Sequence, residues 1–163
     1  LEYDQTHTGS MMVDYRNSRL DFGVNTVVTF GSGQAYTPST VQSDVFGRGW
    51  NIPTASINSG SKPWTSRMDV RIDKGLNLGG VRLNAYLLVL NALNTENVYN
   101  VYNGSGMADD DAWLETPEGR VWSSSHKANY PSADGNSLYL DRLASPGNWG
   151  IPRIVRLGIQ VNI

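Results

Sequence analysis

The chain has 163 residues, 17% of them charged and 39% hydrophobic, and a formal net charge of -2. This length suits one ordinary domain, and the slightly negative charge, with Lys and Arg scattered singly, argues against nucleic acid as a partner. The absence of cysteine excludes disulfides and thiolate metal sites.

The first 30 residues predict a β-hairpin. Apolar side chains recur at every second position of residues 6–16 and again of residues 20–30, with Asn17 and Ser18 between the two runs. A period of two is typical of strands with one apolar face, and Asn and Ser favour turns. Residues 31–62 lose the alternation and are rich in Gly, Ser, Pro, Thr and Asn, which predicts a long exposed loop.

A second hairpin, at residues 65–75 and 81–91, has the clearest pattern in the chain. In its first arm Met68, Val70 and Ile72 alternate with charged residues, and its turn contains Gly79 and Gly80, which can adopt the positive φ of a tight connection. Each arm holds about ten residues, the length that a tilted strand needs to cross a bilayer. Strands of soluble domains most often have about five or six.

Residues 92–150 form a still longer irregular stretch, expected to be a loop, and residues 153–163 alternate as a fifth strand. Short and long connections therefore alternate, which places both short turns at one end of an antiparallel sheet and both long loops at the other. This asymmetry is typical of outer-membrane barrels, but five strands are too few to close one. Since residues 1–5 show neither a methionine nor a signal peptide, we expect a fragment cut from a longer polypeptide.

Five stretches of sequence follow one another in an informative order: DQTHT at 4–8, GSGQAYTP at 31–38, RMDVRIDKG at 67–75, VLNALN at 89–94, and NWGIPR at 148–153 followed by VRLG. Together they resemble the TonB-dependent outer-membrane receptors, especially the subgroup with an N-terminal carboxypeptidase-regulatory-like domain. The resemblance covers essentially the whole chain, as the last five strands of the barrel.

The resemblance implies an all-β fold, an antiparallel transmembrane β-barrel of about 22 strands that encloses a plug. It implies a receptor in the cell outer membrane that imports a bulky nutrient (iron chelate, oligosaccharide or peptide) with energy from a periplasmic TonB-type partner. The plug, the upstream strands and the segment that contacts this partner would lie outside these residues. The resemblance implies no enzyme activity and no cofactor. Family members usually end on an aromatic residue, whereas this chain ends on Ile163.

The polar face of the second hairpin is predicted to face the barrel lumen. Its residues are Arg67, Asp69, Arg71, Asp73, Arg82 and Asn84. They could line a substrate path, but we favour a wet lumen surface in which opposite charges pair across strands and against the plug.

The aromatic residues of the last long loop are candidate ligand contacts, because such rings offer flat apolar faces with polar tips. They are Trp113, Trp122, Tyr130, Tyr139 and Trp149. The alternative is that they pack the loop on itself and form an aromatic rim at the outer interface.

Other candidate chemistry is weak. The acidic run at 109–111 lacks the regularly spaced ligands of a Ca²⁺ site, and the two histidines, His7 and His126, lie far apart in sequence, so no metal site is predicted. Ser124, His126 and Asp134 lie close in sequence, but no G-x-S-x-G turn marks a nucleophile.

Two other classes of protein fit the same pattern. One is a soluble or surface-attached β-sandwich that binds glycan or protein through its aromatic loops. The other is a porin-like channel without energy coupling. The sandwich differs from the barrel in one respect that a structure can address, because its apolar faces must be buried in a common core.

Overall fold

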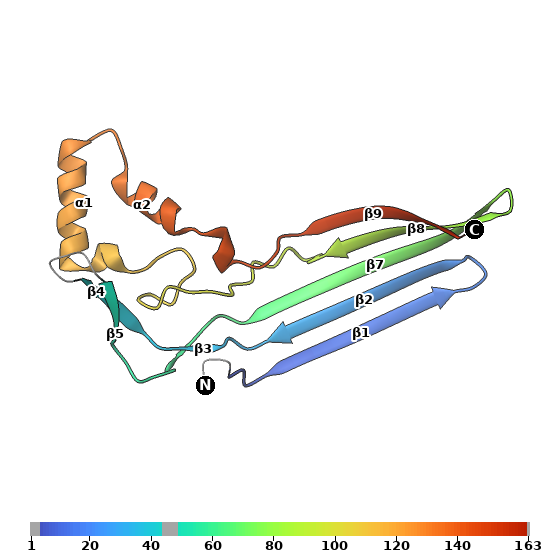
Figure 1. The fold of residues 1–163 in the computed structure, drawn as a ribbon, viewed down its shortest axis with the longest axis horizontal. Helices are drawn as coiled ribbons and strands as arrows, with labels where there is room; N and C mark the ends of the chain where they lie inside the picture. The colour runs from blue at the N-terminus through green and yellow to red at the C-terminus, as the bar shows by residue number, and fades with distance from the viewer. Residues whose placement is uncertain (1–3, 44–48, 163) are drawn as a thin grey trace. The chain divides into compact units, whose positions relative to one another are not determined.

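The computed structural model describes residues 4–43 and 49–162. Its largest element is an antiparallel five-stranded sheet in the order β1-β2-β7-β8-β9 (Figure 1). The strands are β1 (Thr8–Asn17), β2 (Phe22–Gly31), β7 (Thr65–Leu78), β8 (Val81–Leu90) and β9 (Ile154–Asn162). They confirm the five predicted strands to within three residues at each described end. Ile163, the departure from the family pattern, lies outside the described residues.

The chain divides into two compact units, which we describe separately. The sheet unit comprises Thr6–Ser32, Trp64–Asn97 and Ile151–Ile163, and the loop unit comprises Leu1–Gln5, Gly33–Pro63 and Val98–Gly150. Within the sheet unit the described strands form an open sheet rather than a closed barrel, with β1 at one edge and β9 at the other. The structure therefore shows the five-stranded antiparallel sheet, and the described strands do not close into a barrel.

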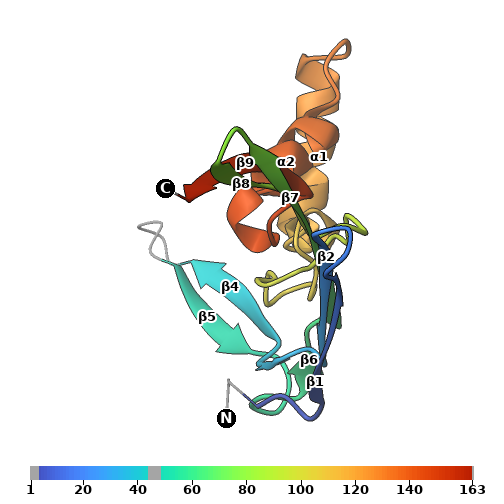
Figure 2. The same ribbon diagram turned by 90° about the vertical axis from the view of Figure 1, so that its right-hand side faces the viewer.

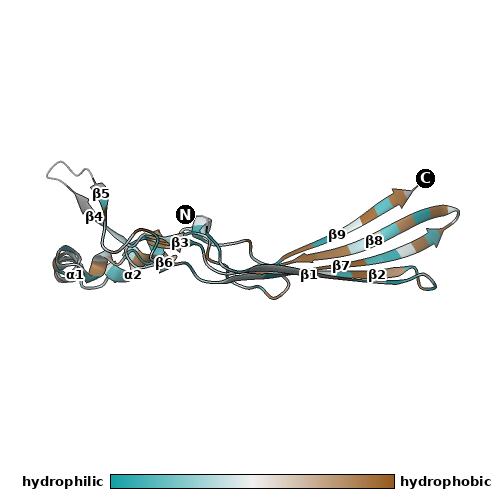
Figure 3. Ribbon diagram, turned by 90° about the horizontal axis from the view of Figure 1, so that it is seen from below, coloured by the Kyte–Doolittle hydropathy of each residue, from teal (hydrophilic) through white to brown (hydrophobic). Residues whose placement is uncertain are grey.

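The strand register gives the sheet one polar and one apolar face. Directly paired residues point to the same side, and Asp73 pairs with Gly23 and Tyr86 while Ile72 pairs with Val24 and Leu87. Hydrophilic and hydrophobic residues consequently alternate along β7, β8 and β9 (Figure 3). The six residues predicted to share the polar face of the second hairpin do share one face in this register.

The apolar face is uncovered. Leu157 is 81% exposed, Ile159 66% and Val13 54%, and among the described residues Ala108 is the buried hydrophobic residue. The exposed apolar side chains of this face include Met11, Val13, Tyr15, Phe30, Leu76, Leu78, Val81, Val155, Leu157, Ile159 and Val161. A sheet that exposes so large a contiguous apolar surface needs an apolar environment or a partner to cover it.

Two glycines let large side chains lie flat on the sheet and so hold its register. A Cβ on Gly158 would come within 2.4 Å of the Tyr86 ring, and a Cβ on Gly9 within 2.4 Å of the Phe30 ring. Each glycine is the direct partner of the aromatic residue across the ladder. Aromatic rings that cover a cross-strand glycine stabilise the pairing of that register.

Both short connections form turns. In the first, predicted at Asn17 and Ser18, Asn17 Oδ1 accepts the backbone N–H groups of Arg19 and Leu20, both at 3.1 Å. Between β7 and β8, Gly79 and Gly80 have φ of 56° and 92°, which confirms the turn predicted from the two glycines. Between β1 and β2, Asp21 has φ 46°, its backbone carbonyl accepts from the Gly75 N–H at 2.7 Å, and Lys74 Nζ donates to the Leu20 carbonyl. The first turn is thus fastened to β7.

The loop unit corrects the prediction that residues 31–62 and 92–150 are irregular loops. The first stretch contains two short antiparallel pairs, β3 (Ala35–Tyr36) with β6 (Gly60–Ser61) and β4 (Ser39–Ser43) with β5 (Gly49–Pro53) (Figure 2). The second contains α1 (Pro117–Asn129), α2 (Gly135–Leu143) and the 3₁₀ turns η1 (Trp113–Glu115) and η2 (Pro146–Asn148). The chain is mostly β but is not all-β.

Local capping explains why both helices begin where they do. The Thr116 side chain accepts a hydrogen bond from the Gly119 N–H at 3.1 Å, and Pro117 occupies the first turn of α1. The Asp134 side chain likewise accepts from the Ser137 N–H at 3.3 Å at the start of α2. These are favoured N-cap and N1 residues. Among the described helices none is long and apolar enough to span a membrane.

Candidate functional site

The polar face of the sheet carries two ion pairs that run along β7. Arg67 Nη2 lies 2.5 Å from Asp69 Oδ2, and Arg71 Nη2 lies 2.8 Å from Asp73 Oδ1. Each pair joins residues two positions apart, which point to the same side of a strand. Asp73 is only 8% exposed, so its charge needs this partner. The paired charges leave this part of the face balanced.

Neighbouring strands extend the polar network. Arg71 also lies over the Tyr86 ring, 4.8 Å from its centroid, in cation–π geometry. Asn84 Nδ2 lies 3.5 Å from both the Asp73 carboxylate and Gln160 Oε1, at the limit of hydrogen bonding. The network therefore crosses β7, β8 and β9, but its ion pairs lie within β7, whereas the prediction had opposite charges pairing across strands.

Arg82, the remaining residue predicted for the lumen, contacts the first turn. Its Nη2 donates to both Asp21 carboxylate oxygens, at 3.2 and 3.0 Å. Both side chains are largely exposed, 63% and 44%, so this pair contributes little to stability by itself. The pair joins the turn between β1 and β2 to β8.

Three asparagines close the opposite end of the sheet, and sequence reasoning missed their role. We call Asn91, Asn94 and Asn97 the asparagine clasp. Asn91 is fully buried at 0% exposure; its Nδ2 donates to the carbonyls of Thr95 and Ile151 at 3.0 and 2.9 Å, and its Oδ1 accepts from the Thr95 N–H at 3.0 Å. The side chain joins the end of β8 to the chain that enters β9.

The other two members of the asparagine clasp bind the neighbouring strand ends. Asn97 accepts from the Ser66 N–H at 2.7 Å and donates to its carbonyl at 2.8 Å, at the start of β7. Asn94 Oδ1 accepts from the Arg153 N–H at 2.9 Å. The asparagine clasp thus fixes the long-connection ends of β7, β8 and β9.

Three of the five aromatic candidates pack against one another. Trp113 from η1, Trp122 from α1 and Tyr139 from α2 have ring centroids 5.1 to 5.9 Å apart. His126 extends the cluster, because its ring centroid lies 5.1 Å from those of both Trp122 and Tyr130, with the rings tilted. This aromatic cluster holds the helical segment together, as the alternative of a self-packed loop expects.

Asp111 interacts with the Tyr139 hydroxyl at the centre of the aromatic cluster. Tyr139 donates from its hydroxyl to Asp111 Oδ2 at 2.8 Å. Burial, followed by the hydrogen bond and charge of Asp111, raises the pKa of the Tyr139 hydroxyl well above its usual range. The hydroxyl therefore remains a donor to Asp111 at alkaline pH values where an exposed tyrosine would lose its proton.

The remaining two aromatic candidates lie outside the centre of the cluster. Tyr130 is 61% exposed. Among the described residues, the one aromatic ring in contact with it is that of His126. Trp149 forms a backbone bridge with Val98. In the sheet unit, His7 and Trp64 form a further stacked pair, with centroids 6.0 Å apart, which the sequence reasoning did not select.

The acidic run and the Ser, His and Asp side chains have structural partners. Asp110 and Asp111 accept the backbone N–H groups of Ala112 and Trp113, at 2.8 and 2.9 Å. Within residues 4–43 and 49–162 no group of three His, Asp or Glu side chains could hold a metal ion. Ser124 Oγ donates to the Arg120 carbonyl, His126 lies in the aromatic cluster, and Asp134 caps α2.

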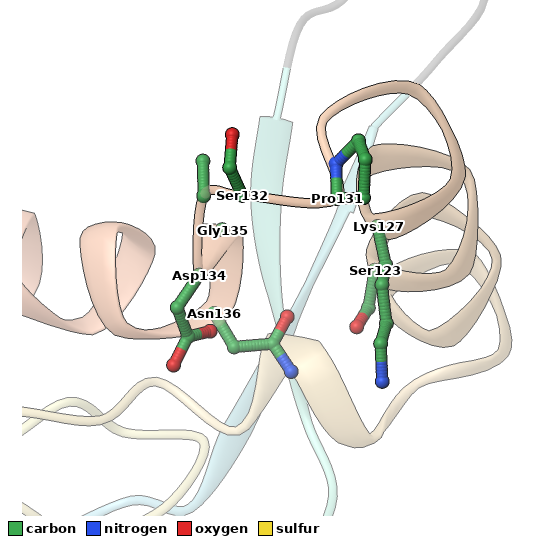
Figure 4. A pocket seen from close by; sticks show the side chains of 8 residues that line it. Ser123, Lys127, Pro131, Ser132, Asp134, Gly135 and Asn136 are labelled. Atoms are coloured by element: carbon green, nitrogen blue, oxygen red, sulfur yellow. The ribbon is translucent and has the colours of Figure 1, made fainter.

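A pocket of about 460 Å³ lies where the turn between α1 and α2 meets the first residues of α2. Ser123 and Lys127 reach it from α1, Ser132 from the turn, and Asp134 and Asn136 from the start of α2 (Figure 4). None of the five aromatic candidates is among its lining residues. Sequence reasoning gave no signal for this pocket, because it treated residues 92–150 as a loop.

Comparisons of the chain with protein-family models, with curated proteins and with solved structures find no match. The geometry defines the chain as a protein with an antiparallel five-stranded sheet, one face of which is apolar and the other ion-paired.

Proposed function

We propose that this chain is a barrel segment of a TonB-dependent outer-membrane receptor that imports a bulky nutrient. The uncovered apolar face of the five-stranded sheet carries the proposal, because aliphatic side chains such as Leu157, 81% exposed, suit contact with lipid. The opposite face, with its paired charges, suits a water-filled lumen. Strands of 9 to 14 residues have the length of tilted transmembrane strands.

The apolar stretches of the two edge strands are offset from each other along the strand direction. In β1 the apolar stretch is 11–15, which lies level with residues 68–72 of β7 through the paired residues of β2. In β9 it is 155–161, which lies level with residues 70–76 of β7 through the paired residues of β8. Its centre moves from position 70 to 73, three residues over four strand steps. With about 3.3 Å per residue and about 4.8 Å per strand, this is roughly 10 Å across 19 Å. The inclination of about 30° is near the tilt of about 35–45° in transmembrane barrels.

The two edges determine what can complete the barrel. Four antiparallel pairings make β1 and β9 run in the same direction. A ring of copies of this chain would pair β9 with β1 in parallel, which antiparallel barrels do not allow. An odd number of additional strands is needed, and a barrel of about 22 strands leaves about 17 besides these five. We assign these strands and the plug to other parts of the same polypeptide.

In this proposal the long connections face the cell exterior and the short turns face the periplasm. The sheet contributes part of the barrel wall, and the loop unit contributes part of the ligand-accessible vestibule. Energy would come from a periplasmic TonB-type protein that binds a segment outside this chain. No catalytic role is proposed for these residues.

Expression of the chain without detergent, followed by size exclusion and circular dichroism, tests this proposal. The proposal predicts aggregation that detergent micelles relieve, with a β-rich spectrum in the micelles. A soluble monomer with a sharp thermal transition in the absence of detergent would contradict it and favour the β-sandwich.

A further inference from the structure

The pocket between α1 and α2 has opposite charges on its two sides. Lys127, in the last turn of α1, and Asp134, at the N-cap of α2, both line it (Figure 4). In the described part of the chain these two side chains do not approach within 4 Å of each other as an ion pair. Both charges are therefore available to groups inside the pocket.

Asp134 is ionised when the pocket is in water. Its hydrogen bonds from the Ser137 hydroxyl and backbone are the main cause that lowers the pKa of this carboxyl, and the positive charge of Lys127 adds to the effect. The Ser137 hydroxyl donates to Asp134 Oδ2 at 2.6 Å, which fixes the carboxylate orientation. A carboxylate has about four acceptor sites, so capping leaves room for a further donor.

Further polar side chains around the pocket have unused hydrogen-bonding capacity. Ser123 Oγ, Ser132 Oγ and the Asn136 side-chain amide line it, and these groups form no hydrogen bond with another described residue. The lining therefore offers one cation, one anion, two hydroxyls and one amide. Its volume, about 460 Å³, is within the range of about 300–1,000 Å³ that small-molecule sites occupy.

We propose that this pocket binds a small zwitterion, of which a free α-amino acid is the simplest form. The ligand carboxylate would contact Lys127, the ligand ammonium would contact Asp134, and the Asn136 amide would bind between them. A doubly charged anion would meet the Asp134 carboxylate and a dication would meet Lys127, so neither fits this lining. A neutral polyol would leave both charges without a partner of opposite sign.

This inference does not depend on the barrel, because every residue involved lies in the loop unit. The proposed function is tested by the apolar face of the sheet, and the pocket is tested by ligand binding. Failure of one can therefore be distinguished from failure of the other.

The test is titration of the full chain in detergent micelles, followed by NMR shifts of the α1 and α2 backbone amides. The probes are glycine and L-glutamine as zwitterions, acetate as an anion, ethylammonium as a cation and glucose as a neutral polyol. We expect saturable shifts with the amino acids and binding by the other three that is at least about tenfold weaker, since each lacks one or both charge-assisted contacts.

Two variants locate the binding. Lys127→Gln and Asp134→Asn should each weaken amino-acid binding by about tenfold, and asparagine keeps the N-cap of α2 intact because it caps as well as aspartate. Arg120→Gln and Asp141→Asn remove one charge of each sign from the same helices, outside the pocket lining, and should leave binding unchanged. Absence of amino-acid binding, equal binding of acetate, or equal loss in the control variants would overturn the proposal.

Discussion

Asn91 is predicted to be the most sensitive single position of the sheet unit. Asn91→Ala removes three side-chain hydrogen bonds, at 3.0, 2.9 and 3.0 Å, from a fully buried site. At about 1 kcal/mol of net stability per bond this is about 3 kcal/mol. The backbone φ of 49° costs alanine roughly 1 kcal/mol more, since asparagine tolerates the left-handed region better. The expected loss is about 4 kcal/mol.

The assay is urea unfolding of the chain in detergent micelles, followed by tryptophan fluorescence and circular dichroism. Asn91→Gly relieves the backbone strain but lacks the amide, so it should lose about 1 kcal/mol less than Asn91→Ala. Asn100→Ala is a matched control, because Asn100 is exposed and donates one bond, to the Gly147 carbonyl at 3.1 Å; it should lose about 1 kcal/mol or less. A loss below that of the control for Asn91→Ala would refute the role assigned to the asparagine clasp.

Three further predictions test other parts of the structure. On the apolar face, Leu157→Arg and Val70→Arg should each lower the free energy of unfolding in a bilayer by about 2–4 kcal/mol. Gln160→Arg, on the polar face, should lower it by less than about 1 kcal/mol. Equal losses on the two faces would contradict the assigned facing. Gly75→Ala would bring a Cβ within 2.1 Å of the Asp21 carboxylate. This side chain is 44% exposed and can rotate away if it gives up its pair with Arg82, so the change should cost about 0.5–1 kcal/mol. Gly147→Ala, whose nearest neighbour lies at 3.6 Å, should be nearly neutral in the same unfolding experiment. The pKa of Tyr139 is raised in the folded state. Its contribution to stability is therefore complete below pH 10, the usual pKa of tyrosine, and falls as the pH rises above that value. Tyr139→Phe should remove this alkaline loss of stability, and an unchanged pH profile in the variant would contradict the prediction.

The five strands could be predicted because each contains a long period-two alternation, and period two depends only on local sequence. The same is true of the turn at Gly79 and Gly80, where positive φ is a local demand. The registers of β1 with β2 and of β7 with β8 also followed, because antiparallel neighbours joined by short turns have little freedom in register. The pairings of β2 with β7 and of β8 with β9 cross long connections, so there the match of the two apolar faces sets the register.

The helices were missed for a physical reason. α1 contains no sustained apolar repeat, since Val121 and Trp122 are its large apolar residues, and its start is marked only by the capping residues Thr116 and Pro117. Capping signals without a 3.6-residue apolar stripe are weak indicators of a helix. A stripe was not needed here, because aromatic residues from three separate elements supply the packing.

The asparagine clasp and the pocket depend on contacts between distant residues. The motif that contains Asn91 and Asn94 was visible in the sequence, but the bond from Asn91 to Ile151 joins residues 60 positions apart. Sequence spacing could not predict that contact, nor the approach of Trp113 to Tyr139. The polar residues of the pocket are unremarkable in sequence, and only the turn between two helices brings them together.

The most direct test of the membrane account uses the absence of cysteine in the chain. Single-cysteine variants are made at Val13, Leu87 and Leu157 on the apolar face and at Asn25, Asn84 and Gln160 on the polar face. They are labelled with an environment-sensitive fluorophore and transferred to mixed micelles of detergent and phospholipid. The account predicts blue-shifted emission and quenching by lipid-attached nitroxides at the first three positions, and quenching by iodide at the other three. Iodide quenching of equal strength on both faces would contradict it.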